Sequence, residues 1–269
     1  MKQTAFSIGF IGAGRLATQL AMGLQAAGHH IRAVYSRTLA SAERLSEHLG
    51  NGEGRVVTNR LADMPSCDLF IIAVPDKAVA EMAGQWGALG KGGVVVHTAG
   101  SMPMDLLSPA ALHYGVFYPM QTFTKEKKVD FTQVFIYIEA SDASTLQLLQ
   151  ELGASLSPHV AELSSADRQF LHLGAVMACN FSNHLFDLAF SFLSRHGIEP
   201  GCLLPLVDET VRKLQEMHPH DGQTGPAARR DMEVIAHHLS MLQDDKDLLL
   251  IYKTLTESIL GHSILPAAK

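Results

Sequence analysis

The sequence predicts an α/β fold, a doubly wound and mostly parallel sheet, followed by an all-helical C-terminal domain. Short apolar runs alternate with helical stretches through the first 163 residues. The early runs are continuously apolar, as expected of parallel strands that are buried on both faces. From residue 164 onward only long amphipathic helical patterns follow. Because strand and helix in alternation imply crossovers and a parallel sheet, we predict two domains, 1–163 and 164–269.

The individual elements follow from the period of the apolar residues and from the turn residues between them. The predicted strands are Ser7–Ile11, Ile31–Tyr35, Leu69–Val74, Val94–His97, Val116–Tyr118 and Val134–Ile138. The predicted helices are Arg15–Ala27, Ser41–Leu49, Lys77–Trp86, Met104–Ala111, Ala166–Leu193, Gly201–Glu216, Pro226–Leu242 and Lys246–Leu260.

The composition excludes several classes of protein. The chain has 269 residues, of which 47% are hydrophobic and 18% charged, as is typical of a folded globular protein. Its net charge of −6 gives no reason to expect nucleic acid or an anionic membrane as a partner. Three cysteines without CxxC spacing indicate reduced thiols. Since neither a signal peptide nor an apolar run of roughly 20 residues is found, we expect a cytoplasmic protein.

A glycine-rich turn directly follows the first predicted strand. Gly12, Gly14 and Ala17 form the pattern G-x-G-x-x-A at the start of a strand–helix–strand unit. Gly12 permits a tight turn, Gly14 lets the backbone approach a pyrophosphate, and Ala17 lets the helix pack closely on the sheet. In this context the pattern predicts a Rossmann fold that binds a dinucleotide. The predicted contacts in this turn are Gly12, Ala13, Gly14, Arg15 and Leu16.

The end of the second predicted strand indicates which dinucleotide binds. An NAD site usually places Asp or Glu there, to accept hydrogen bonds from the ribose. This chain has Ser36, Arg37 and Thr38 instead, which offer a cation and two hydroxyls to a 2′-phosphate. We therefore predict NADP(H) as the cofactor. The alternative is that Arg37 is a solvated surface residue.

Three further loops follow predicted strands at the carboxyl edge of the sheet, where ligands of open α/β sheets lie. Val74 and Pro75 would form an apolar wall along the cofactor, and residues 98–101 would approach the nicotinamide. The third loop, residues 118–123, begins with a tyrosine whose hydroxyl could hydrogen-bond a substrate carbonyl. Each loop alone could be structural, but together they predict the floor of a site. The residues predicted there are Thr98, Ala99 and Gly100 for the cofactor, Ser101 and Gln121 for the substrate, and Tyr118 for catalysis.

Four segments resemble a bacterial family of Rossmann-like NADP oxidoreductases with a helical C-terminal domain of unknown function. They are 97–101 (HTAGS), 115–123 (GVFYPMQTF), 180–184 (NFSNH) and 224–231 (TGPAARRD). The layout is also similar to that of pyrroline-5-carboxylate reductase, deazaflavin-dependent NADP oxidoreductases and 3-hydroxyacid dehydrogenases. The resemblance covers nearly the whole chain. It implies a homodimer built through the helical domain and an active-site cleft between the domains, but no particular substrate.

The chain departs from the 3-hydroxyacid dehydrogenases at a position that their chemistry needs. Their catalytic lysine follows a glycine-rich helix start by six residues, and counting from Gly174 places Asn180 there. Asparagine cannot donate a proton as an ammonium group can, so the lysine chemistry is not carried over. Tyr118 also stands where members of the resembling family often have histidine, and a phenol is a weaker acid at neutral pH.

Polar residues recur at helical spacing early in the helical domain. Asn180, Asn183, His184 and Asp187 would share one face of an otherwise apolar helix. One interpretation is that they form hydrogen bonds between helices in a dimer core. The other is that they face the nicotinamide across the cleft, so that Asn180 and Asn183 orient a carbonyl or imine and His184 supplies a proton. On this second interpretation we predict Asn180, Asn183 and His184 as catalytic.

A second candidate region precedes the third C-terminal helix. Thr224 and Pro226 predict a helix start, with Thr224 as N-cap and Pro226 in the first turn. Arg229 and Arg230 would then lie beside free N–H groups and could bind a substrate carboxylate or phosphate. A salt bridge from Arg229 to a nearby carboxylate or to a partner chain is the alternative.

Taken together, the sequence predicts an NADP(H)-dependent oxidoreductase that acts on C=O or C=N of a small acidic metabolite. A non-catalytic NADP(H)-binding sensor and a deazaflavin-linked hydride shuttle remain as alternatives. The histidine pairs at 218 and 220 and at 237 and 238 lack the spacing of a zinc-binding helix, so no metal is predicted.

Overall fold

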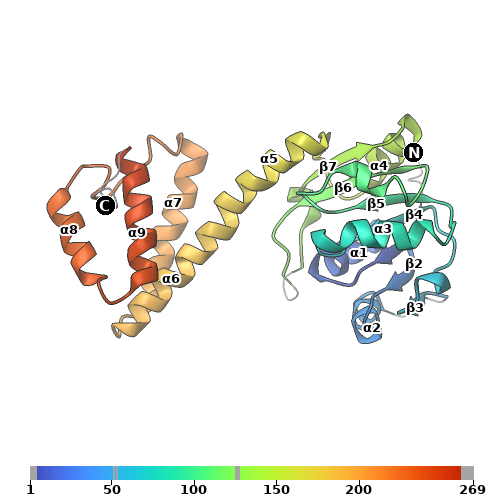
Figure 1. Cartoon of the computed structure of the whole chain (residues 1–269), viewed down its shortest axis with the longest axis horizontal. Coiled ribbons are helices and arrows are strands. Elements are labelled where there is room, and N and C mark those ends of the chain that lie inside the picture. The colour runs from blue at the N-terminus through green and yellow to red at the C-terminus, as the bar shows by residue number, and fades with distance from the viewer. Residues whose placement is uncertain (1–4, 51, 53, 125–127, 262–269) are drawn as a thin grey trace, which may run out of the picture. The chain divides into compact units, whose positions relative to one another are not determined.

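The computed structural model describes residues 5–50, 52, 54–124 and 128–261. The chain divides into two compact units, residues 1–179 and residues 180–269. We call the first the sheet unit and the second the helical unit. Both units can be followed by their labels in Figure 1.

An open, mostly parallel sheet forms the centre of the sheet unit (Figure 1). Its strands are β1 (Ser7–Ile11), β2 (His30–Tyr35), β3 (Val56–Thr58), β4 (Leu69–Ile72), β5 (Val94–His97), β6 (Tyr114–Met120), β7 (Phe135–Ala140) and β8 (Val160–Glu162). They lie in the order β3-β2-β1-β4-β5-β6-β7-β8. β7 pairs antiparallel with β6, and the other neighbouring strands pair in parallel. The strand order reverses between β1 and β4, which is the switch point where ligands of doubly wound sheets bind.

Helices cover both faces of this sheet. They are α1 (Arg15–Ala26), α2 (Leu39–His48), α3 (Val79–Gly87) and α4 (Ala143–Ala154), and a further helix, α5 (Ser165–Ala175), follows β8. Alternate residues of one strand point to opposite faces. In β4, Leu69 and Ile71 therefore join the core under α1, α2 and α4, whereas Phe70 and Ile72 join the core under α3. The residues of both cores are buried, which explains why β1 and β4 are almost continuously apolar. The predicted α/β fold is confirmed.

Trp86 lies in the core under α3. It is the chain's single tryptophan, it is fully buried, and its ring lies tilted against Phe70 with the centroids 4.3 Å apart. The Lys91 ammonium lies over the indole at 5.9 Å from its centroid, a cation–π contact. The indole therefore reports directly on the packing of the sheet unit.

The helical unit contains α6 (Ser182–Arg195), α7 (Leu204–Glu216), α8 (Met232–Met241) and α9 (Lys246–Leu260) among its described residues. Its buried apolar cluster consists of Ala227, Ile235 and Leu260, with Leu239 and Tyr252 packed against it. An ion pair of 2.7 Å joins Arg195 at the end of α6 to Asp245, the N-cap of α9. No helix within the described residues is both long enough and apolar enough to cross a membrane.

Several predicted elements differ from the structure. The predicted helix Ala166–Leu193 is interrupted between α5 and α6 by a π-helical segment, Val176–Phe181. A π turn contains more residues than an α turn, so the spacing that placed Asn180 on one face with residues 183, 184 and 187 does not hold. Instead of the predicted helix Met104–Ala111 there is a short 3-10 turn, Met104–Leu107. The short strands β3 and β8 and the helix α4 were not predicted.

The predicted helix start at Thr224 is also wrong. α8 begins at Met232, and its N-cap is Asp231, whose carboxylate accepts a hydrogen bond from the Val234 amide. Residues 225–231 form a separate turn in which the Asp231 amide donates to the Pro226 carbonyl. The aspartate side chain caps the helix at the Val234 amide, and Arg229 and Arg230 precede the helix and do not stand in its first turn.

Candidate functional site

The glycine turn lies between β1 and α1 and depends on two different properties of glycine. Gly12 has a φ of +117°, and its amide donates to the Tyr35 carbonyl at 2.8 Å. A Cβ on Gly12 would also overlap the Ala73 carbonyl, so no other residue fits there. Gly14 is the N-cap of α1, and a Cβ on it would meet only open space. The free amides at the start of α1 are therefore accessible to an anion.

The other loops predicted for the cofactor lie at the same edge of the sheet. Residues 36–38 connect β2 to α2, residues 74–75 follow β4, and residues 98–101 follow β5. Because β1, β2, β4, β5 and β6 run in parallel, their carboxyl ends meet at one edge. Tyr118 lies near the end of β6, and Gln121 follows that strand. The site residues predicted within the sheet unit thus all lie at or next to this edge, and their roles stay predictions.

His97, at the end of β5, shapes the loop that follows. The Ala99 amide donates to its Nδ1 at 3.1 Å, so the Nε2 hydrogen is directed to the Pro103 carbonyl at 3.3 Å. The imidazole is fully buried, and burial, reinforced by the charge of Arg168, lowers its pKa to about 4. His97 is therefore neutral at physiological pH and holds residues 98–103 in place.

A carboxylate that the sequence analysis missed lies beside this loop. The hydroxyl of Ser101 donates to Oδ2 of Asp76, which follows Pro75 after β4. The contact joins the loop that follows β4 to the loop that follows β5. Its position after a strand of the parallel sheet is the signal that could have identified Asp76.

A buried ion pair fixes α5 to the sheet. Nη1 of Arg168 lies 2.7 Å from Oε2 of Glu139 on β7, and Nη2 donates to the Met102 carbonyl. The guanidinium is fully buried. Ser165, at the start of α5, donates its amide and hydroxyl to the same carboxylate. This network binds β7, α5 and the loop after β5 into one body, and no local sequence pattern indicated it.

Tyr118 has a histidine partner that was also not predicted. Its hydroxyl lies 3.2 Å from Nδ1 of His172 on α5. Burial, together with the negative charge of Asp76, raises the pKa of Tyr118, while Arg168 acts in the opposite direction. The phenol therefore remains protonated at neutral pH.

The remaining predicted site residues belong to the helical unit. Asn180 is in the π-helical segment, and Asn183 and His184 are in the first turn of α6. All three are exposed. Arg229 is exposed in the turn before α8, followed by Arg230, whose φ of +56° is unusual for a residue with a side chain.

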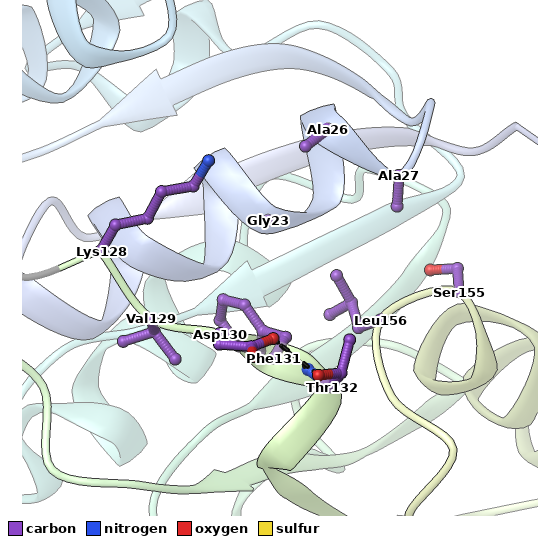
Figure 2. A pocket seen from close by; sticks show the side chains of 10 residues that line it. All are labelled: Gly23, Ala26, Ala27, Lys128, Val129, Asp130, Phe131, Thr132, Ser155 and Leu156. Carbon is purple, nitrogen blue, oxygen red and sulfur yellow. Dashed lines mark hydrogen bonds between the residues drawn. The ribbon is translucent and has the colours of Figure 1, made fainter.

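A pocket of about 470 Å³ lies elsewhere in the sheet unit (Figure 2). It is lined by Gly23, Ala26 and Ala27 at the end of α1, by residues 128–132 and by Ser155 and Leu156 after α4. The glycine turn is at the other end of α1, roughly 15 Å away at 1.5 Å per residue. This pocket is therefore not the predicted dinucleotide site.

A parallel sheet with a glycine turn and a helix N-terminus at its switch point defines the class of Rossmann-fold dinucleotide-binding proteins. Comparison with known families agrees. A model described as a Rossmann-like domain matches residues 1–118, and one described as a domain of unknown function (DUF2520) matches residues 134–259.

A solved structure from Bacteroides fragilis, described as a "putative NADP oxidoreductase", is 41% identical to this chain. The match covers 96% of this chain and 99% of that one, with a TM-score of 0.88. The chain therefore belongs to the family of that protein, which confirms the resemblance found in the sequence.

More distant structures share the fold. A protein from Thermotoga maritima is 21% identical over 96% of this chain and 93% of that one, with a TM-score of 0.70. Pyrroline carboxylate reductase from Plasmodium falciparum, with NADP bound, is 11% identical over 95% and 97%, with a TM-score of 0.58. A search of curated proteins finds no match.

Proposed function

We propose that this protein is an NADP(H)-dependent oxidoreductase that reduces C=O or C=N of a small acidic metabolite. The observation that carries the proposal is the meeting of the glycine turn with residues 36–38, 74–75 and 98–101 at the carboxyl edge of one parallel sheet. The family supports it, because the Bacteroides fragilis member is described as an NADP oxidoreductase.

The residues at this edge fit such a cofactor. The open space at Gly14 lets a pyrophosphate approach the N-terminus of α1. Arg37 and Thr38 are exposed immediately before α2, and the turn contains no carboxylate that would repel a 2′-phosphate. Val74 and Pro75 supply an apolar wall. The reduced nicotinamide, when bound, supplies the hydride and both electrons of the reduction.

The substrate side of the proposal rests on polar groups at the edge of the sheet. Ser101 and Gln121 would hydrogen-bond the substrate beside Tyr118. For the helical unit, Asn180 and Asn183 stay predicted to orient the carbonyl or imine, with His184 as a candidate proton donor. All of these groups can donate a hydrogen bond to an oxygen, which suits a polarised double bond.

Arg229 would bind the acidic group of the substrate. A guanidinium binds a carboxylate or phosphate through paired hydrogen bonds. The unusual backbone conformation of Arg230 supports a functional role for this turn, since strained residues concentrate at binding sites.

Replacement of Arg37 tests the choice of cofactor. We expect Arg37→Ala to weaken NADPH binding by about 10- to 100-fold, the effect of losing a charge-assisted hydrogen bond of roughly 1.5–3 kcal/mol. NADH binding should change by less than about twofold, because NADH lacks the 2′-phosphate. Calorimetric titration of both cofactors measures the difference. Arg32→Ala, an exposed arginine near the start of β2, is the matched control. Equal losses for NADPH and NADH would contradict the assignment.

The activity itself is tested with NADPH and a panel of 2-keto acids, cyclic imines and deazaflavins. Oxidation of NADPH, followed by the absorbance of the reduced nicotinamide, is expected with a keto acid or an imine. Turnover of a deazaflavin alone would favour the hydride shuttle. Tight NADPH binding without turnover would favour the sensor.

We also propose that the protein is a homodimer built through its helical unit. Exposed apolar side chains on α7 and α9 support this, since monomers rarely leave such surfaces uncovered. They are Leu204, Leu206, Val211 and Leu214 on α7, and Leu250, Leu255 and Ile259 on α9.

A further inference from the structure

The spacing of α5 matches the spacing of the strand pair beneath it. Val116 and Tyr118 lie on one face of β6, and Glu139 pairs with Val116 across to β7. Two residues along a strand advance about 6.6 Å, and four residues along a helix advance about 6 Å. Arg168 and His172 are one helical turn apart, so the helix that places Arg168 on Glu139 also places His172 on Tyr118.

The rings of Tyr118 and His172 are surrounded by β6, α5 and the loop after β5. Tyr118 on β6 is only 8% exposed, and the imidazole of His172 lies edge-on to it with the centroids 6.2 Å apart at 71°. The backbone of Gly100 closes the third side. A Cβ on Gly100 would overlap Nδ1 of His172 and stand 3.0 Å from Cζ of Tyr118. Both rings therefore lie against the loop after β5, which we assign to the nicotinamide end of the cofactor.

We propose that Tyr118 and His172 form the proton-delivering pair of this site, with Tyr118 in contact with the substrate and His172 acting through it. This inference rests on the proposed function. When hydride reaches the substrate carbon, the carbonyl oxygen or imine nitrogen takes the proton of the Tyr118 hydroxyl. The phenolate left behind takes a proton from Nδ1 of His172 while Nε2 takes one from solvent, so the imidazole stays neutral and solvent supplies the proton overall. The substrate gains one hydride and one proton, so the electrons and protons balance.

The charges around Tyr118 suit this step. Arg168 is buried on α5, the helix that carries His172, and its guanidinium stays protonated. Its positive charge favours the transient phenolate of Tyr118. Asp76 and Tyr137 act in the opposite direction. Burial keeps the hydroxyl protonated until the substrate oxygen or nitrogen becomes basic. Imidazole is the side chain that exchanges protons readily at neutral pH, which a tyrosine alone does not.

The experiment compares Tyr118→Phe and His172→Asn with the wild type on the keto acid or imine turned over fastest. For Tyr118→Phe we expect kcat to fall by about 10²- to 10⁴-fold, the usual contribution of a general acid, with the NADPH Kd unchanged. His172→Asn keeps a polar atom near the Nδ1 position but carries no exchangeable acid. We expect it to lower kcat by about 10- to 100-fold and to change the shape of the kcat–pH profile, because asparagine has no proton to exchange at neutral pH. His113→Asn, on the loop before β6, is the control and should leave the profile unchanged.

His172→Ala supplies a second readout. Added imidazole should restore part of its kcat, which it could not do if His172 only supported the fold. A His172→Asn profile that keeps the wild-type shape, or the absence of imidazole rescue, would overturn the role of His172 while leaving the oxidoreductase intact. Failure of the wild type to turn over any substrate would instead overturn the proposed function, and the pair with it.

Discussion

The two units bury their apolar residues to very different extents. The sheet unit has two large clusters of buried side chains, one on each face of the sheet. In the helical unit the described cluster is limited to Ala227, Ile235 and Leu260. Large apolar residues such as Leu206 and Leu250 are 64% and 60% exposed. The sheet unit therefore has the core of a self-contained domain, whereas the helical unit leaves large apolar side chains exposed, which is the surface that the proposed homodimer would cover.

Replacing one leucine in each unit should give the largest difference in the free energy of unfolding. Leu20 on α1 is fully buried, so Leu20→Ala is expected to lower the free energy of unfolding by about 2–5 kcal/mol. Leu250→Ala on α9 should lower it by less than about 1 kcal/mol in the dissociated chain. It should also shift the molar mass at low concentration toward that of the monomer. Urea denaturation and sedimentation measure the two effects. Similar losses of folding free energy for both variants would show that α9 is buried as deeply as α1.

Lowering the pH should destabilise chiefly the sheet unit. The pKa of His97 is lowered to about 4 in the folded state from 6.5, and burial lowers the pKa of His29 as well. A group whose folded pKa is depressed binds more protons when unfolded, so stability is present above pH 6.5 and is lost as the pH falls toward about 4. The expected loss from His97 is about 3 kcal/mol, at roughly 1.4 kcal/mol per pH unit.

Urea denaturation at pH 7.5 and pH 5 measures this dependence. His97→Asn keeps an acceptor near the Ala99 amide but does not titrate, so its stability should vary less with pH than that of the wild type. His237→Asn in α8 of the helical unit is the control. An unchanged pH dependence in His97→Asn would show that the loss arises at another group.

The smallest change in stability is expected from removing the N-cap of α5, the helix that carries Arg168 and His172. The Ser164 side chain caps this helix by accepting from the Asp167 amide at 3.1 Å. Ser164→Ala should cost about 1 kcal/mol. Ser191→Ala, an exposed serine within α6, should change stability by less than about 0.5 kcal/mol. A thermal melt of each variant tests whether the cap holds α5 on the sheet.

The same contrast explains what the sequence could predict. The glycine turn and the loops after the strands were found because parallel strands send their carboxyl ends to one edge, and local residue type decides each turn. His172 was missed because its contact with Tyr118 joins residues 54 positions apart in the chain and depends on where α5 starts from the sheet. β3 and β8, at three residues each, are too short to show a period. The prediction of a helix start at Thr224 was wrong because α8 is capped by Asp231, seven positions later.

The position of the single tryptophan gives the chain a built-in optical label. Trp86 is buried under α3, in the sheet unit. Its emission should therefore follow the melting of that unit, whereas far-ultraviolet circular dichroism records the helices of both. Two curves that separate under urea would resolve two cooperative transitions in one unmodified chain, and the order of the transitions would show which unit unfolds first.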